Sequence, residues 1–490
     1  MNAETRKACL NQLRDAIPEA MAHMEGSAGA LSLAEYARGM SQTGDAPLQD
    51  GEDLIALAEA EAARIFSPAT GAALRRELET RFLALTANHH GVDFHPEFLQ
   101  GDLVFALGCK DAVPLFACGG VPCNNMAYPR GLLFPPREAG SAKPGRFPAL
   151  AAGDRHAFVN AQIPFCAAHV HSALDGLPRA GLAETERHFA AEMLTGVYLH
   201  PSVLRQTCFR DQMSAANALL WNRLAGSGLR LPPLACLDFQ HLCGLLLAEE
   251  LKHPDTLAHA LLLEPELTKA IFHALNGARA CWSIQEDEPP MRGSFLFWGL
   301  DEKGRGVPLR PDFRERALIS PRRPDMRFAL KQDALSTALA SRRLLPTLYL
   351  SFAMTALARG LACAGGVFQF AYLPAMKKGT AEALRRCGEH ARADRLSVSC
   401  PLGAGFHALR APGTQNEDPD HAAGPLDILR HGGLSEKDWR TFGELRTEEA
   451  FLSSLQFQYE DIIPEAERLP GWFEALRRTP SFVLQHDKKI

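Results

Sequence analysis

The stretch Thr86-Ala-Asn-His-His-Gly-Val-Asp-Phe-His-Pro96 directly follows the short apolar run Phe82-Leu-Ala-Leu85. It brings three imidazoles, an amide, a carboxylate and a glycine into eleven residues. A short apolar run that ends in polar residues and glycine is typical of a buried strand followed by a loop. Because ligands bind at the carboxyl ends of the strands in open α/β sheets, this stretch predicts a ligand site at a strand end.

The polar residues of this stretch are the first candidates for chemistry. We predict catalytic roles for His89, His90 and Asp93, because imidazoles move protons near neutral pH and stabilise negative charge. Asn88 and His95 are predicted to bind the ligand, and Gly91 allows a close backbone approach. Further predicted ligand-binding residues lie outside the stretch and supply amides or a guanidinium group: Asn124, Asn125, Arg343 and Gln369.

Strand-length apolar runs alternate with segments of helical periodicity along most of the chain. This alternation predicts an α/β fold with a mainly parallel core sheet. The expected core strands are Leu103–Leu107, Val113–Cys118, Leu234–Asp238, Val367–Tyr372 and Arg395–Cys400, and a strand pair is expected on either side of Asp301–Gly304.

The pattern also predicts how the chain is divided. Residues 1–80 have helical periodicity, and residues 81–410 form the α/β core with a helical insertion at about 184–280. The segment 411–425 is rich in proline, glycine, asparagine and aspartate, which predicts a linker, and 426–490 form a small helical region. The long loop Tyr128–Phe147 is rich in proline and glycine, and loops of this length inside a domain are often functional.

Composition excludes several classes of protein. The 490 residues are 46% hydrophobic and 22% charged, with a net charge of -5, which is ordinary for a globular enzyme and argues against nucleic-acid binding. The longest apolar segment, Leu344–Gly366, contains Thr347, Ser351, Thr355 and Arg359, so a buried helix is expected rather than a membrane span. Because the twelve cysteines form no CxxC pair and the N-terminus lacks a signal-peptide pattern, we expect a cytoplasmic protein with reduced thiols. The strand-end stretch indicates a small-molecule substrate. Self-association into a homo-oligomer stays open.

Two other chemistries are compatible with the sequence. His89, His90 and His95 with His169 and His171 offer nitrogen ligands for zinc or iron, which would give a metal-dependent hydrolase or oxygenase. The segment Cys118–Cys123 offers a cysteine nucleophile. The HExxH motif, a GxGxxG sequence opening a helix and the GxxxxGK[ST] loop are all absent from the sequence.

A set of landmarks resembles the cysteine-adding enzyme family of bacillithiol biosynthesis. That family carries a strand-end motif Thr-Gly-Gln-Gln-x-Gly followed by Gly-Pro. Here Thr86, Gly91 and Pro96 match, whereas Asn88 and His89 stand where the family has glutamines. Three later segments resemble family segments in the same order: Val113-Pro-Leu-Phe, Ser320-Pro and Leu344-Leu-Pro-Thr347. The acidic segment that follows the family's second strand is replaced here by Cys118–Asn125.

The resemblance spans residues 82–375 and implies a Rossmann-like, nucleotide-binding type of core with inserted helices. It also implies condensation of an amine or amino acid with an activated partner, and hence a ligase or transferase acting on a small polar metabolite. A nucleotide is the cofactor that the resemblance suggests, and a divalent metal is the alternative. A non-catalytic binding or accessory protein built on an enzyme-like core stays open as well.

Overall fold

The computed structural model describes residues 3–40, 51–125, 131–138, 140–150, 153–284, 292–412, 420–477 and 482–484. Its central element is a four-stranded parallel sheet in the order β12-β1-β2-β5. The strands are β1 (Leu83–Leu85), β2 (Val113–Ala117), β5 (Leu234–Asp238) and β12 (Ala362–Ala364). All of their residues are buried, as expected for parallel strands covered on both faces. The prediction of a mixed α/β fold with a parallel sheet is thus confirmed.

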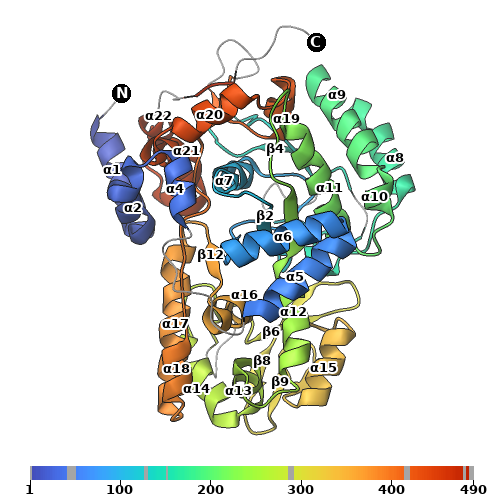
Figure 1. Cartoon of the computed structure of the whole chain (residues 1–490), viewed down its shortest axis with the longest axis vertical. Helices are drawn as coiled ribbons and strands as arrows, with labels where there is room; N and C mark the ends of the chain where they lie inside the picture. Colours follow the sequence, from blue (N-terminus) through green and yellow to red (C-terminus); the bar gives the residue numbers. More distant parts are fainter. Residues whose placement is uncertain are drawn as a thin grey trace.

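Helices from the N-terminal and the middle parts of the chain pack against this sheet. The hairpin of α5 (Gly51–Ile65) and α6 (Pro68–Thr80) packs against β2 and β5, and α7 (Pro96–Ala106) packs against β2. The helices α11 (Phe209–Leu224) and α12 (Phe239–Glu250) pack against β5. Local sequence sets the start of α12, where the Asp238 carboxylate accepts from the backbone N–H of His241 at 2.7 Å. Figure 1 shows α5 and α6 crossing the middle of the molecule.

The two ends of the chain lie side by side. The N-terminal helices are α1 (Ala3–Ala16), α2 (Pro18–Glu25), α3 (Ser27–Ala30) and α4 (Leu33–Gly39). They contact the C-terminal helices α20 (Glu436–Glu444), α21 (Thr447–Ile462) and α22 (Trp472–Leu476). In Figure 1 the blue N-terminal helices accordingly stand beside the red C-terminal ones. Helix α19 (Pro425–Arg430) precedes this group and packs against α11.

The other elements form small sheets and peripheral helices. Antiparallel pairing gives the sheets β10-β9-β8, β11-β6-β7, β3-β4 and β13-β14. Their strands are β3 (Leu132–Phe134), β4 (Gly145–Phe147), β6 (Phe297–Leu300), β7 (Gly306–Pro308), β8 (Arg310–Asp312), β9 (Ala317–Ile319), β10 (Arg327–Ala329), β11 (Leu344–Pro346), β13 (Arg410–Ala411) and β14 (His421–Ala422). The remaining helices are α8 (Ala167–Gly176), α9 (Glu184–Met193), α10 (Pro201–Leu204), α13 (Leu257–Leu263), α14 (Pro265–Leu275), α15 (Gln332–Ala340), α16 (Leu348–Phe352), α17 (Gln369–Arg386) and α18 (His390–Arg395), together with the short η2 (Val159–Ala161), η3 (Leu177–Arg179), η4 (Leu194–Tyr198), η5 (Ala353–Leu357) and η6 (Glu465–Glu467).

Three of the predicted strands are wrong. Leu103–Leu107 lies in and directly after α7, whose central residues are buried on every side, so its apolar run has no helical periodicity. Val367–Tyr372 contains the start of α17 instead of a strand. Arg395 ends α18 and the residues from Leu396 to Cys400 are irregular, although the Ser399 carbonyl accepts from the N–H of Cys363 in β12 at 2.9 Å. The expected pair around Asp301–Gly304 is confirmed as β6 and β7.

Two further expectations concern single segments. Leu344–Gly366 divides into β11, α16, η5 and β12, and within the described ranges no helix has the length and apolar character needed to cross a membrane. The predicted linker 411–425 includes residues 413–419, which lie outside the described part of the chain; on either side of them, β13 pairs with β14.

Candidate strand-end site

A cavity of about 290 Å³ lies where β12, β1 and β2 end. We call it the strand-end cavity. Its size is that of a small metabolite, close to the lower limit of about 300 Å³ for small-molecule sites. The lining comes from the ends of three strands, from α7, from α17 and from α21: Thr86, Ala87, His89, His95, Glu97, Phe98, Cys118, Leu348, Gly366, Val367, Phe368, Gln369, Tyr372, Ala404, Phe457, Gln458 and Asp461.

His89 is held at the cavity wall in one tautomer. The pairing of β1 with β2 continues past the strands, since the N–H of Cys118 donates to the Asn88 carbonyl and that of His90 donates to the Cys118 carbonyl. The Asn125 amide lies 2.9 Å from Nδ1 of His89. Because an amide nitrogen only donates, Nδ1 accepts and the proton of the neutral ring is on Nε2. Burial lowers the pKa of His89 to about 4, so the ring is neutral at physiological pH.

His95 caps the helix that brings Glu97 to the cavity. Its Nδ1 accepts from the backbone N–H of Glu97 at 3.3 Å, and Pro96 occupies the first turn of α7. Burial, assisted by the neighbouring His407 and His89, lowers the pKa of His95 to about 3. The Glu97 carboxyl oxygens contact the Gln458 amide and His407, whose Nε2 lies 3.0 Å from Oε2.

Gln369 joins the ends of β1 and β12. Its amide nitrogen donates to the Thr86 hydroxyl and to the Cys363 carbonyl, both at 3.0 Å, and its carbonyl oxygen accepts from the Tyr372 hydroxyl at 3.2 Å. A Cβ atom on Gly365 would lie 2.2 Å from Cδ of Gln369. The absent side chain at position 365 therefore makes room for the amide.

Cys118 lines the cavity as a thiol. The Gln240 amide donates to its sulfur at 3.0 Å, and burial raises its pKa to about 11. A thiol with so high a pKa is a weak nucleophile at neutral pH, because the thiolate is the reactive form. Cys123, the other cysteine of the predicted nucleophile segment, is buried.

The cavity carries little positive charge. Among the described residues that line it, none is a lysine or arginine, whereas Glu97 and Asp461 supply carboxyl groups. With His89 and His95 neutral, the polar lining consists of hydrogen-bonding groups and carboxylates. Helix α17 begins beside it at Gln369, and the N-terminus of a helix carries a partial positive charge. The carboxyl groups of the lining thus suit a cationic group, and the start of α17 suits an anionic group.

Other residues of the opening stretch are buried away from this lining. The Asn88 amide donates to both carboxyl oxygens of Asp102, at 2.9 and 3.2 Å. The Gly91 carbonyl accepts from the Asn217 amide at 3.0 Å. Asp93 accepts from the N–H groups of Phe94 and Leu133, and its burial raises its pKa to about 7. These contacts hold the loop in place.

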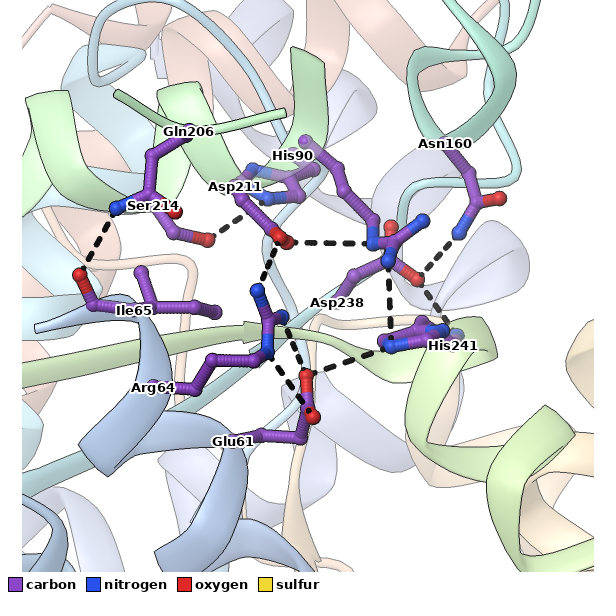
Figure 2. Close-up of polar contacts among 11 residues, drawn as sticks. Glu61, Arg64, Ile65, His90, Asn160, Gln206, Asp211, Ser214, Asp238 and His241 are labelled. Atoms are coloured by element: carbon purple, nitrogen blue, oxygen red, sulfur yellow. Dashed lines mark hydrogen bonds and ion pairs between the residues drawn. The ribbon is translucent and has the colours of Figure 1, made fainter. Parts of the chain in front are cut away.

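His90 belongs to a second group of polar residues, at the end of β5 (Figure 2). Its Nε2 lies 3.3 Å from the Ser214 hydroxyl. Nearby, Asp211 pairs with Arg64 at 2.7 Å and with Arg210 at 3.3 Å. We call the whole group the β5 network: Glu61, Arg64, His90, Asn160, Arg210, Asp211, Ser214, Asp238 and His241.

The remaining predicted residues are distributed over the surface and over turns. Asn124 is exposed and lies 3.3 Å from His156, whereas Asn125 holds His89 as described. The Arg343 guanidinium stacks on Phe328, 5.2 Å from the ring centre, and is outside the cavity lining. His169 and His171 are exposed on α8. In the described part of the chain, no three His, Cys, Asp or Glu side chains are grouped to hold a metal ion.

The structure therefore gathers His89, His95 and Gln369 of the predicted set around one cavity, with Asn125 behind His89. It also places there residues that the sequence interpretation did not select as site residues. Glu97 directly follows the His95–Pro96 pair, which is a recognisable helix start. Gln458 and Asp461 belong to α21, more than 350 positions after Glu97. No local sequence pattern identifies them as site residues.

Comparison of the chain with protein-family models, with curated proteins and with solved structures found no match.

Proposed function

We propose that the chain is an enzyme of ligase or transferase type that binds an amino acid or a related small amine in the strand-end cavity. The observation that carries this proposal is His89, a partly buried neutral imidazole oriented by Asn125 in a metabolite-sized cavity at the ends of three parallel strands. The absence of a lysine or arginine from the described lining disfavours a phosphate-rich group inside the cavity itself.

The lining supplies groups for both ends of an amino acid. The carboxylates of Glu97 and Asp461 attract an ammonium group, and Glu97 accepts a proton when the amine becomes a nucleophile. The positive end of α17 attracts the carboxylate of the same molecule. The neutral His89 ring carries its proton on Nε2 and donates a hydrogen bond to an oxygen on which charge develops during condensation.

The fold and the sequence resemblance support the same proposal. A parallel sheet with a ligand cavity at its carboxyl edge is the arrangement of Rossmann-like cores, and we extend the proposal to that class. The resemblance to the cysteine-adding family includes Thr86 and Gly91, which lie on either side of His89. The activated partner of the condensation is a separate molecule, and its activating group leaves as the bond to the amine forms.

A thermal-shift screen tests this proposal. The purified chain is heated with the standard amino acids, amino sugars, ATP and inorganic phosphate. We expect at least one amine-bearing compound to raise the unfolding temperature of the wild-type chain, His89→Ala to abolish that rise, and His171→Ala, on the exposed face of α8, to retain it. The proposal fails if no amine binds the wild-type chain, or if His89→Ala responds as the wild type does.

A further inference from the structure

The strand-end cavity presents its apolar side chains to a ligand more than its polar ones. The apolar lining side chains that are only half-buried come from the end of β1, from α7, from α16 and from the start of α17: Ala87, Phe98, Leu348, Phe368 and Tyr372. Most of the polar lining side chains are instead buried: Thr86, His95, Glu97, Gln369 and Gln458. The composition of the lining therefore overstates how polar the cavity is to a ligand.

The buried polar side chains make hydrogen bonds within the protein. Gln369, only 2% exposed, bonds with the Thr86 hydroxyl, the Cys363 carbonyl and the Tyr372 hydroxyl. Gln458, only 4% exposed, donates its amide to Glu97. A polar side chain of a ligand would lose its hydrogen bonds to water in the cavity and find few partners on this part of the lining.

Aromatic rings form a large part of the apolar surface. The Phe98 ring lies 5.5 Å from the His89 ring and 5.6 Å from the His95 ring, and Phe457 lies 5.1 Å from His95, measured between ring centres. Because both imidazoles are neutral, these four rings form one continuous uncharged surface. Rings in such an arrangement pack favourably against apolar and aromatic groups.

The start of α17 adds a second apolar surface. Phe368 directly precedes this helix, and Leu348 begins α16. The Arg279 guanidinium stacks on Phe368, 4.1 Å from the ring centre, but Arg279 is not part of the cavity lining. The ring of Phe368 therefore contributes apolar surface to the cavity without bringing a cation into the lining.

Two polar side chains of the described lining do remain accessible. His89 is half-buried and carries its proton on Nε2, and Asp461 is exposed. Asp461 comes one helical turn after Phe457 on α21, so the carboxylate and the ring share one face of that helix. The cavity thus offers a donor and a carboxylate for one polar end of a ligand, and mainly apolar surface for the remainder.

We infer that the amine-bearing substrate of the strand-end cavity has an apolar side chain, as leucine, valine and phenylalanine do. This inference rests on the proposed function, because it names the substrate class of the same cavity. An apolar side chain gains free energy when the half-buried rings and Leu348 remove it from water. Asparagine, threonine and amino sugars carry amides or hydroxyl groups that this surface leaves without partners.

Titration calorimetry of the wild-type chain with pairs of similarly sized amino acids tests the inference. The pairs are leucine with asparagine and valine with threonine. We expect the apolar member of each pair to have a Kd at least about tenfold lower, and phenylalanine to show whether an aromatic side chain binds tighter than a branched one. Comparable or tighter binding of asparagine, threonine or an amino sugar would overturn the inference and leave the proposed function standing. If no amine-bearing compound binds, the proposed function itself fails.

A variant of the apolar surface gives a second test. Leu348→Asn places an amide of nearly the same size in the lining and should raise the Kd of leucine at least about tenfold. Leu339→Asn is the matched control, because Leu339 is a half-buried leucine of α15 outside the lining, and the Kd should not change there. Full leucine affinity in a folded Leu348→Asn variant, or an equal loss in both variants, would overturn the inference. If Leu348→Asn does not fold, the amino-acid pairs on the wild-type chain decide.

Discussion

The strand-end cavity and the β5 network occupy two halves of the same sheet edge, yet their polar residues are arranged in opposite ways. Around the cavity, His89, His95 and Cys118 are held in their uncharged forms beside unfilled space. In the β5 network, Arg64 and Arg210 flank Asp211, and the side chains of Figure 2 are bonded to one another. The polar residues at the strand ends thus line a cavity, whereas the printed contacts of the β5 residues are mainly with one another.

The largest effect is expected from breaking the β5 network. Asp211→Ala leaves Arg210 buried without its carboxylate, and breaking such a pair costs about 3–5 kcal/mol of the free energy of unfolding. Urea unfolding measures this loss. Asp325→Ala removes the exposed partner of Arg323, and its expected cost is below about 1 kcal/mol. Equal losses in the two variants would show that the network is not a buried stabilising element.

Substitutions at two glycines, one beside each region, should have smaller effects that distinguish the β5 network from the strand-end cavity. A Cβ atom at Gly119 would lie 1.8 Å from the Asp238 carboxylate, and one at Gly365 would lie 2.2 Å from the Gln369 amide. Each substitution to alanine should cost about 1–3 kcal/mol of stability through overpacking. Gly365→Ala should in addition weaken binding of the compound found in the thermal-shift screen, whereas Gly119→Ala should not. Titration calorimetry on both variants checks the difference, and equal weakening would contradict it.

Asp93 makes the stability of the opening loop depend on pH. Burial raises its folded-state pKa from 3.8 to about 7, so the folded chain holds this proton more tightly than the unfolded chain does. The resulting stabilisation is complete below about pH 4 and is lost as the pH rises through about 7. The drop in unfolding free energy between pH 5 and pH 8 should therefore be smaller in Asp93→Asn than in the wild type. The same drop in both would rule out Asp93 as its source.

The smallest effect is expected for the pH dependence of binding in the cavity. Because the pKa values of His89 and His95 are lowered to about 4 and 3, these rings stay neutral from pH 6 to pH 8 and should add nothing to the pH dependence there. Below about pH 4, protonation of both rings should weaken the binding of an ammonium group. Dissociation constants measured with the wild type and with His89→Gln check this. A histidine-dependent change in affinity between pH 6 and pH 8 would contradict the neutral lining.

The sequence predicted where two core strands end better than it predicted which of the following side chains lie together. The apolar runs before Thr86 and Cys118 do end at one sheet edge, because both strands are parallel and adjacent. Neighbouring side chains of an extended segment point to opposite sides, so His89 lines the cavity while Asn88 and His90 on either side of it are buried elsewhere. The number of histidines in the motif does not show which side chains face the cavity and which are buried elsewhere.

The remaining part of the site depends on tertiary structure. The helix that follows the motif, α7, is mostly buried, and its last residues belong to the apolar run Leu103–Leu107 that the sequence predicted as a strand. Gln458 and Asp461 reach the cavity because the C-terminal helices pack back onto the N-terminal ones, which is a contact between distant segments. For Arg343 the sequence was misleading. This residue directly precedes the buried strand β11, but its side chain lies over Phe328, outside the cavity.

The central claim is that the strand-end cavity is where the chain binds its small-molecule ligand. Ala87 lines this cavity, and Ala87→Phe fills part of its 290 Å³ without removing any polar group. The most direct measurement is the Kd of the compound found in the thermal-shift screen, determined by titration for the wild type, for Ala87→Phe and for the surface control His171→Phe. We predict that Ala87→Phe raises the Kd at least about tenfold, a loss of about 1.4 kcal/mol, while His171→Phe leaves it unchanged. An unchanged Kd in a folded Ala87→Phe variant would contradict the claim.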